Sequence, residues 1–214
     1  MKTVIINASP RKDKNTAQML KAAQRGAESA GAETRYVDLY DLSFTGCRSC
    51  LACKRKDAER CRCYWNDDLS PLISEVLSAD ALIIGSPIYF GEPTAGYRAF
   101  LERLLFCVLS YDVGEPYFKG KVDTGIIYTM NAPREFYENG MSQNYKGTEG
   151  MIARMLNGEV RTVAACNTVQ VDDYSRYAMG RFSEEDKKAY RDEQFPRDLE
   201  EAFRLGAELG AKKA

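Results

Sequence analysis

Histidine is absent from this sequence of 214 residues. Without an imidazole, the chain cannot build a Ser-His-Asp triad, a Cys-His nucleophile pair, or a zinc or haem site with a His ligand. General acid–base catalysis near neutral pH would depend on a retuned carboxylate, Lys, Tyr or Cys instead. The absence therefore disfavours much hydrolytic chemistry and favours a reaction for which a cofactor supplies the reactivity.

Long apolar runs and an excess of one charge are lacking too. The apolar run Val4-Ile5-Ile6 near the N-terminus is too short for the core of a signal peptide, and no window approaches a membrane span. Thirty basic residues against 31 acidic ones give a net charge of −1, which provides no global basic field for nucleic acid or an anionic membrane. We therefore expect a cytoplasmic protein without nucleic-acid or membrane partners, whose seven cysteines do not form structural disulfides.

The residues that are present alternate between strand-like and helix-like patterns. Strands are predicted at 2–8, 33–40, 79–86, 122–130 and 160–166, and helices at 15–30, 67–78, 93–109, within 150–156 and at 184–212 with a break at 195–196. The second of these helices would be capped by Asp68 or Ser70, and the third would start with Pro93 and Thr94. The alternation predicts one α/β domain over residues 1–214, a doubly wound five-stranded parallel sheet with helices on both faces. Ligands of such sheets bind beyond the carboxyl ends of the strands.

The loop after the first strand has the donors of a phosphate site. No Gly occurs before Gly26, so the loop is neither the Gly-rich dinucleotide fingerprint nor a P-loop. The hydroxyls of Ser9 and Thr16, the Asn15 amide and the free N–H groups at the helix start can all donate to one anion. Arg11 adds a forked cation. The combination predicts that this loop binds a phosphate group.

This loop resembles the S-x-R-x-x-x-N-[ST] phosphate loop of the NADPH-dependent FMN reductases and iron–sulfur flavoproteins, which are flavodoxin-like proteins that bind FMN. The resemblance continues after the next strands, at residues 85–91, 128–131 and 167–175. It implies FMN as cofactor, NAD(P)H as a transient co-substrate, and a homodimer or homotetramer in which the partner covers the flavin. The implied FMN contacts are Ser9, Arg11, Asn15 and Thr16 for the phosphate, Pro87, Ile88, Tyr89, Phe90 and Gly91 along the isoalloxazine edge, and Thr129, Met130 and Asn131 on the opposite wall.

Elementary chemistry independently supports residues 85–91 as a wall for the flavin ring. A flavin ring needs a flat, partly apolar wall with backbone N–H donors where charge collects on reduction. Pro87 fixes a turn, Gly91 permits close backbone approach, and Tyr89 and Phe90 offer aromatic edges or faces.

Five of the seven cysteines are crowded into one predicted loop, residues 44–66. Cys47, Cys50 and Cys53 have the compact spacing of an iron–sulfur ligand set. Cys63 is the preferred fourth ligand, because its distance to the helix that follows matches the relatives, and Cys61 is the alternative. A [4Fe-4S] cluster, zinc and metal-free thiols all remain open. Basic neighbours are expected to lower the pKa values of these thiols, namely Arg48, Lys54, Arg55, Lys56, Arg60 and Arg62.

The leading functional hypothesis is an FMN-dependent oxidoreductase. The flavin would take hydride from NAD(P)H and pass electrons to a quinone, a nitroaromatic, free flavin or a redox protein, so no catalytic side chain is required. The alternatives are an iron–sulfur flavoprotein that carries electrons between ferredoxin and an acceptor, and a flavin-binding redox sensor. Residues 131–147, rich in Tyr, Asn and Gly, are expected to form a lid or interface loop.

Overall fold

The computed structural model describes residues 1–212 and is built on a sheet of five parallel strands. The strands are β1 (Lys2–Asn7), β2 (Glu33–Asp38), β3 (Ala81–Tyr89), β5 (Asp123–Thr129) and β6 (Val160–Ala165). Their order is β2-β1-β3-β5-β6, and a short strand β4 (Glu92–Pro93) pairs antiparallel with the end of β3. This order is the flavodoxin-like one, and it confirms the predicted fold. The central strands are buried along almost their whole length, as their near-continuous apolar runs require.

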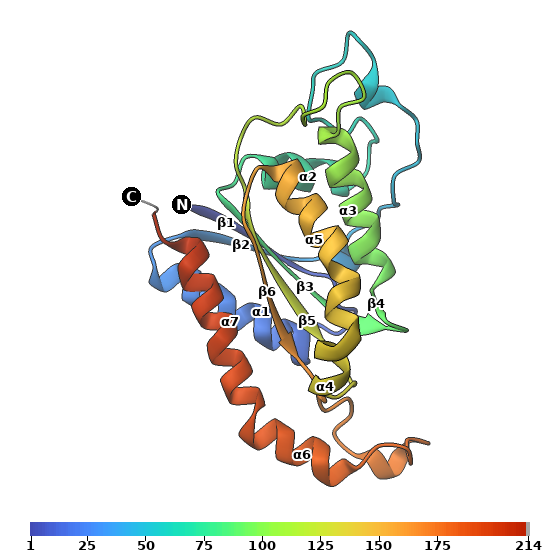
Figure 1. Cartoon of the computed structure of the whole chain (residues 1–214), viewed down its shortest axis with the longest axis vertical. Helices are drawn as coiled ribbons and strands as arrows, with labels where there is room; N and C mark the ends of the chain where they lie inside the picture. The colour runs from blue at the N-terminus through green and yellow to red at the C-terminus, as the bar shows by residue number, and fades with distance from the viewer. Residues whose placement is uncertain (213–214) are drawn as a thin grey trace.

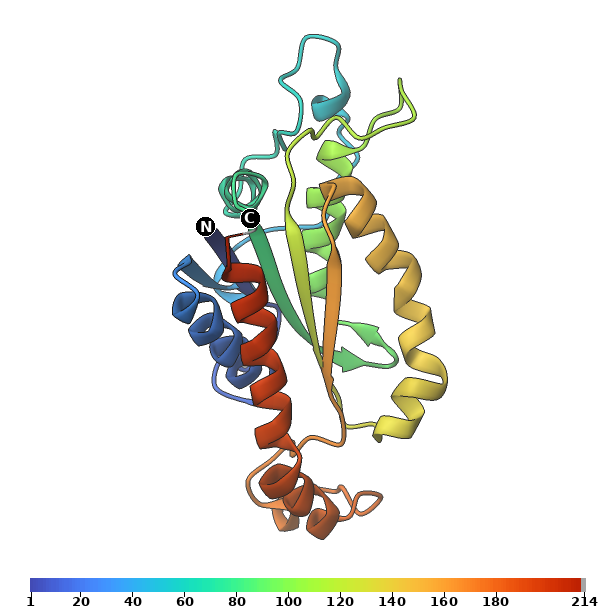
Figure 2. The same ribbon diagram turned by 60° about the vertical axis from the view of Figure 1, so that its left-hand side comes forward.

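Helices cover both faces of the sheet (Figures 1 and 2). On one face lie α1 (Asn15–Ser29) and α7 (Phe195–Gly210), and on the other lie α2 (Leu69–Leu77), α3 (Ala95–Val108) and α5 (Ser142–Leu156). Beyond the carboxyl ends of the strands lie α4 (Arg134–Phe136) and α6 (Glu184–Glu193) (Figure 1). Short helical turns complete the order: η1 (Leu39–Asp41), η2 (Ala52–Lys54), the π-helical turn η3 (Tyr137–Met141) and η4 (Tyr174–Arg176).

The contact between α1 and α7 depends on glycine. A Cβ on Gly206 would lie 1.8 Å from the backbone oxygen of Ala23, and one on Gly26 would lie 1.9 Å from that of Phe203. Neither distance is tolerable, so these glycines let the two helix backbones approach directly. This close packing fixes the C-terminal helix against the helix that begins at the predicted phosphate loop.

Several predicted helix boundaries need correction. Asp68 holds the N-cap position of α2, as one of the two predicted caps, but the capping side chain is that of Asp67: its Oδ1 accepts the backbone N–H groups of Leu69 and Ser70 at 3.1 and 3.3 Å. Asp68 instead accepts the backbone N–H of Ser43 at 2.8 Å. The predicted helix break near residue 195 is confirmed, because α6 ends at Glu193 and a new helix begins at Phe195.

The start of α3 also differs from the prediction. Pro93 belongs to β4, and Thr94 alone caps the helix through its hydroxyl, which accepts the backbone N–H of Tyr97 at 3.3 Å.

Residues 134–147 are helical, whereas the sequence suggested a loop over 131–147. The Tyr, Asn and Gly content suggested irregular structure, but the segment continues into an amphipathic helix whose buried face includes Tyr145, Glu149 and Ile152. A π-helical turn, η3, joins the single turn α4 to this helix. Tertiary burial of one face therefore overrides weak local propensity here.

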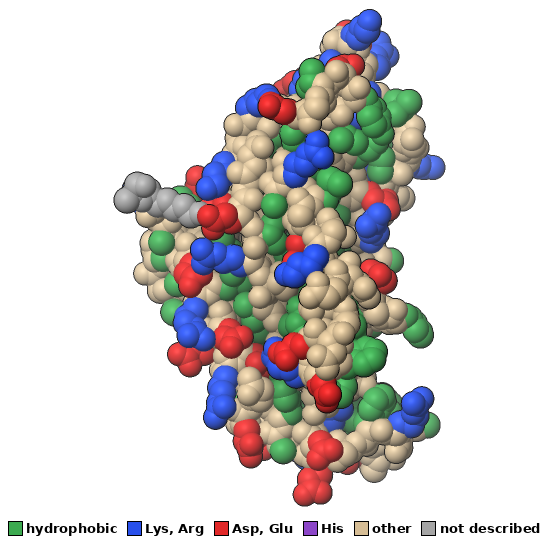
Figure 3. Space-filling view, viewed as in Figure 1, with side chains coloured by type: hydrophobic (Ala, Val, Ile, Leu, Met, Phe, Trp, Pro, Cys, Tyr) green, Lys and Arg blue, Asp and Glu red, His purple; other side chains and the backbone are tan. Residues whose placement is uncertain are grey.

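Charged side chains of both signs are interspersed over the face of the molecule seen in Figure 3. None of the helices within residues 1–212 combines the length and the apolar character that crossing a bilayer requires.

Candidate cofactor site

Four segments meet around one cavity of about 190 Å³ at the carboxyl end of the sheet: the loop after β1, the end of β3, the end of β5 with the residues that follow it, and the segment after β6. Ten of the twelve residues predicted to contact FMN line it: Ser9, Arg11, Asn15, Thr16, Pro87, Ile88, Tyr89, Thr129, Met130 and Asn131. The loops meet because parallel strands place their carboxyl ends at one edge of the sheet. The sequence prediction of one site made from three separate segments therefore agrees with the geometry.

The phosphate loop is held in shape by its own hydroxyls and amides. The Ser9 hydroxyl accepts the backbone N–H of Arg11 at 3.1 Å, and the Ser9 backbone N–H donates to the side chain of Asn7 at 3.0 Å. The hydroxyls of Thr16 and Thr129 share a buried hydrogen bond of 2.7 Å, which ties the first loop to the end of β5. No side chain caps the N-terminus of α1, so its first N–H groups are available to an anion.

The two longer donors of the loop contact the segment after β6. The Arg11 guanidinium donates to the backbone oxygen of Gln170 at 2.5 Å, and the Asn15 amide donates to that of Val169 at 2.7 Å. Thr168 and Gln170 also line the cavity, as does Lys14. The site prediction missed these three residues, although their positions directly after strands were the signal that could have found them.

The far wall of the cavity contains an unsatisfied polar atom. The side-chain oxygen of Asn131 is buried and has no hydrogen-bond partner within residues 1–212. Such an atom is costly unless a ligand donates to it. A ring N–H of a flavin is a donor of the required kind, so the residues present fit the group. On the backbone side, the Lys187 ammonium donates to the Asn131 carbonyl at 2.9 Å, and burial lowers the pKa of this lysine to about 8.

Two of the predicted contacts lie on the hairpin between β3 and β4. Phe90 and Gly91 do not line the cavity; they form the turn, with positive φ angles of 53° and 86°. Phe90 is fully exposed, and a Cβ on Gly91 would meet no atom within 4 Å. The glycine therefore serves the backbone conformation rather than close approach. The Tyr145 hydroxyl donates to the Gly91 carbonyl at 2.8 Å and anchors the turn to α5.

The cysteine loop lies apart from this cavity and packs against the second half of α3. Cys47, Cys50, Cys53 and Cys63 line one small cavity of about 20 Å³, whereas Cys61 lines a neighbouring groove that Cys63 also borders. All seven thiols are free. Among residues 1–212, no three Cys, Asp or Glu side chains stand close enough together to hold a metal ion. The preferred set of four thus shares one cavity but does not show ligand geometry, and no reaction step is derived through a cluster.

At two of the thiols burial outweighs the basic neighbours. Burial raises the pKa values of Cys53 and Cys61, although Lys54 acts to lower both and Arg60 acts to lower that of Cys61. Three other cations of the loop are engaged elsewhere: Arg48 stacks 4.3 Å from the centre of the Trp65 ring, Arg55 pairs with Asp57 at 2.9 Å, and Arg62 pairs with Glu59 at 3.0 Å.

Two cations hold the cysteine loop to α3. The Arg103 side chain is only 1% exposed; it pairs with Asp67 at 2.7 Å and donates to the Cys63 sulfur at 3.0 Å. Lys54 donates to the carbonyls of Phe106 and Leu109 at the end of α3, where cations are favoured. Burial lowers the pKa of this lysine.

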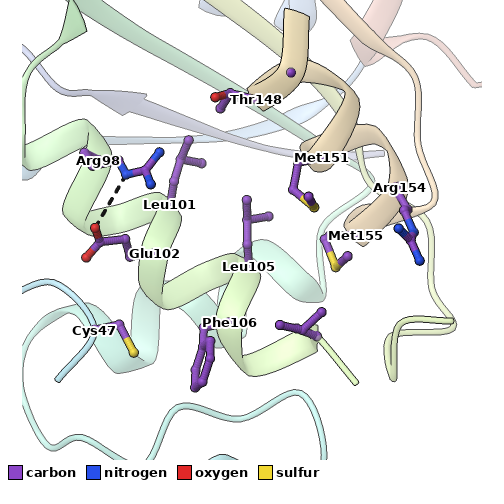
Figure 4. A pocket seen from close by; sticks show the side chains of 12 residues that line it. Cys47, Arg98, Leu101, Glu102, Leu105, Phe106, Thr148, Met151, Arg154 and Met155 are labelled. Carbon is purple, nitrogen blue, oxygen red and sulfur yellow. Dashed lines mark ion pairs between the residues drawn. The ribbon is translucent and has the colours of Figure 1, made fainter. Parts of the chain in front are cut away.

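A larger cavity of about 480 Å³ lies between α3 and α5, and it differs in character (Figure 4). Leu101 and Leu105 face Met151 and Met155 across it. None of the predicted FMN contacts lines it. The smaller, polar cavity is therefore the candidate cofactor site, because phosphate and ring donors converge only there among the described residues.

The flavodoxin-like sheet, with the predicted phosphate loop directly after β1, is typical of mononucleotide-binding α/β proteins. The chain belongs to the NADPH-dependent FMN reductase family, whose model matches residues 1–133. An iron–sulfur flavoprotein of Methanocaldococcus jannaschii is 32% identical over 103 residues, which cover 48% of this chain and 51% of that protein. One from Archaeoglobus fulgidus is 35% identical over 105 residues, or 49% of this chain and 46% of that protein. The matched segments thus span about half the length of these curated relatives.

Solved structures share the fold over the whole chain. An NAD(P)H:quinone oxidoreductase from Methanothermobacter marburgensis superposes with a TM-score of 0.72 at 16% identity, covering 100% of this chain and 99% of that one. An azoreductase from Bacillus anthracis gives a TM-score of 0.67 at 13% identity, covering 97% and 99%. At these identities the likeness concerns the fold alone.

Proposed function

We propose that the protein is an FMN-dependent oxidoreductase that takes hydride from NAD(P)H and passes electrons to a small acceptor or a redox protein. The observation that carries the proposal is the convergence of ten predicted contacts, from three separate segments, on one cavity. Membership of the NADPH-dependent FMN reductase family supports it.

Each wall of the cavity has a role in this proposal. The N-terminus of α1, with Ser9, Asn15 and Thr16, binds the FMN phosphate, and Arg11 adds charge-assisted hydrogen bonds. Asn131 receives a ring N–H of the flavin. Bound FMN supplies the hydride-accepting chemistry, so the chain's own task is to orient the ring and to stabilise charge near it.

The mouth of the cavity suits transient partners. Tyr89 is 47% exposed at its edge, and the neighbouring Phe90 projects fully into solvent. Aromatic surfaces of this kind can stack on a nicotinamide or on a planar acceptor. Candidate acceptors are a quinone, a nitroaromatic, free flavin or another redox protein. In the proposal a second copy of the chain covers the flavin, residues 131–147 contribute to that contact, and the reaction takes place in the cytoplasm.

Anaerobic stopped-flow mixing tests the proposed reaction. Protein loaded with FMN is mixed with NADPH or NADH, and the yellow flavin absorbance is followed. The proposal expects rapid bleaching by at least one nucleotide and recovery of the colour when a quinone is added. If neither nucleotide bleaches the flavin but reduced ferredoxin does, the protein is an electron carrier instead.

A second candidate, an iron–sulfur flavoprotein, is favoured by one specific observation: Cys47, Cys50, Cys53 and Cys63 line a common cavity. The names of the relatives support it. Anaerobic reconstitution with iron and sulfide tests it. Broad visible absorbance that survives Cys61→Ser but is lost in Cys63→Ser would establish the cluster and its fourth ligand. The reverse pattern would assign Cys61, and protein that takes up no iron would leave zinc or free thiols.

A further inference from the structure

A second cavity adjoins the candidate cofactor cavity. Its volume is about 440 Å³, more than twice the 190 Å³ of the first. Lys14, Asn15 and Gln170 line both cavities and so form their common wall. The second cavity lies between the start of α1, the segment after β6 and the helix α6.

The charges around this second cavity are arranged unevenly. Lys14 pairs with Asp172 at 3.1 Å, but the Asp172 side chain is 88% exposed and therefore lies at the rim. Lys188 pairs with Glu184 at 2.7 Å along α6. Arg191, in contrast, has no carboxylate partner within residues 1–212. Two charged groups in the wall of the cavity thus have no ion-pair partner within residues 1–212, the Arg191 guanidinium and the Asp13 carboxylate.

Neutral contacts hold this guanidinium in place. It donates to the side-chain oxygens of Gln18 at 2.9 Å and of Asn15 at 3.4 Å, and it stacks 4.5 Å from the centre of the Phe195 ring. An arginine positioned in this way is pre-organised for a phosphate, because its fork matches phosphate oxygens and little side-chain entropy remains to be lost. Asn15 connects the two sites, since its oxygen faces Arg191 while the residue also lines the FMN phosphate loop.

The remaining wall suits a nucleoside better than a bare ion. Val171 and the mostly buried Tyr174 supply apolar and aromatic surface, and the Tyr174 hydroxyl is fixed by the backbone N–H of Gln170 at 3.1 Å. Gln18 and Asp13 add polar groups suited to sugar hydroxyls. Shape, aromatic surface and an unpaired arginine together describe a site for a phosphorylated adenosine.

We propose that this second cavity binds the adenosine phosphate end of NADPH, with Arg191 as its main phosphate contact, while the nicotinamide reaches the flavin in the first cavity. The inference rests on the proposed function, because it concerns the same reductant. It predicts a preference for NADPH over NADH, since the additional phosphate of NADPH meets the uncompensated guanidinium.

Direct binding of adenosine 2′,5′-bisphosphate, the half of NADPH that lacks nicotinamide, tests the inference without turnover. Titration calorimetry on FMN-loaded protein compares the wild type with Arg191→Met and with the control Arg197→Met, an exposed α7 position that lines neither cavity. Loss of charged hydrogen bonds predicts roughly ten- to hundredfold weaker binding in Arg191→Met and unchanged binding in the control. Arg191→Lys should recover part of the affinity.

Other outcomes would overturn the inference about the second cavity and leave the proposed oxidoreductase function unaffected. Absence of bisphosphate binding, or equal binding by wild type and Arg191→Met, would refute it, even if NADPH still bleaches the flavin. Tighter binding of FAD than of FMN to the apoprotein, lost in Arg191→Met, would assign the cavity to the adenylate of the flavin instead. Failure of NADPH to bleach the flavin while the bisphosphate binds through Arg191 would count against the proposed function rather than against the site.

Discussion

The cofactor cavity and the cysteine loop are held in place by different means. The loops of the cavity begin at the ends of β1, β3 and β5, whose register is fixed by backbone hydrogen bonds. The cysteine loop has little regular structure beyond the single turn η2, and Arg103 and Lys54 fasten it to α3. A site on strand ends is positioned by the sheet itself, whereas a site on a long loop depends on a few side-chain contacts.

The largest expected effect concerns the contact that holds the cysteine loop. Arg103→Met removes a guanidinium that is 1% exposed and leaves Asp67, which is 11% exposed, without its partner. Breaking such a pair costs about 3–5 kcal/mol of unfolding free energy, measurable by urea denaturation. Arg98→Met, whose side chain is 68% exposed, is the control and should change stability by no more than about 0.5 kcal/mol. Equal effects of the two substitutions would refute the proposed anchoring role.

The next effect concerns the phosphate loop. Arg11→Ala should weaken FMN binding by about 1.5–3 kcal/mol, because a charge-assisted hydrogen bond is lost. Quenching of flavin fluorescence measures the dissociation constant. Lys12→Ala removes the neighbouring cation, which pairs with Asp41 and does not line the cavity, and should leave FMN affinity unchanged. Unchanged affinity in Arg11→Ala would remove this residue from the phosphate site.

A smaller effect is expected at the hairpin turn. Tyr145→Phe deletes the hydroxyl that donates to the Gly91 carbonyl, at a cost of about 0.5–1.5 kcal/mol in unfolding free energy. Tyr111→Phe, at a ring that is 69% exposed, is the matched control and should be neutral. If both variants unfold at the same denaturant concentration as the wild type, the hydroxyl does not anchor the turn.

The smallest effect is a pH dependence. Burial lowers the pKa of Lys187 to about 8, below its ordinary value near 10.5. Between these two values the unfolded chain binds more protons than the native one, so this residue's contribution to stability rises with pH across that window and falls as pH drops through about 8. The difference in unfolding free energy between wild type and Lys187→Met should therefore shift in favour of the wild type from pH 8 to pH 10.5. A difference that is flat with pH would contradict the lowered pKa.

The two regions also differ in how much the sequence predicts. Strand periodicity predicted the sheet, and ten of the twelve predicted FMN contacts line the cavity, because the ends of parallel strands must meet. Phe90 and Gly91 do not line the cavity, because a two-residue strand, β4, folds the chain back at once, and the sequence does not show this strand. The hydroxyl bond between Thr16 and Thr129 spans 113 residues and has no local signal.

For the cysteine loop, the spacing predicted which four thiols share a cavity but not their chemistry. The charged side chains around the loop explain why the chemistry of the thiols could not be predicted. Arg103 reaches Cys63 from a helix 40 residues further along the chain, whereas Arg48 stacks on the Trp65 ring and Arg55 pairs with Asp57. Side-chain partners of this kind are decided by packing, which a sequence pattern does not contain.

The measurement that tests the account most directly separates the two regions. A variant with serine at positions 47, 50, 53, 61 and 63 is loaded with FMN and mixed anaerobically with NADPH, and the flavin absorbance is followed. If the cavity at the strand ends is the site of reaction, this variant binds one FMN per chain and is bleached at the rate of the wild type. A variant that holds FMN but is no longer bleached would show that the cysteine loop takes part in flavin reduction, and it would contradict the account.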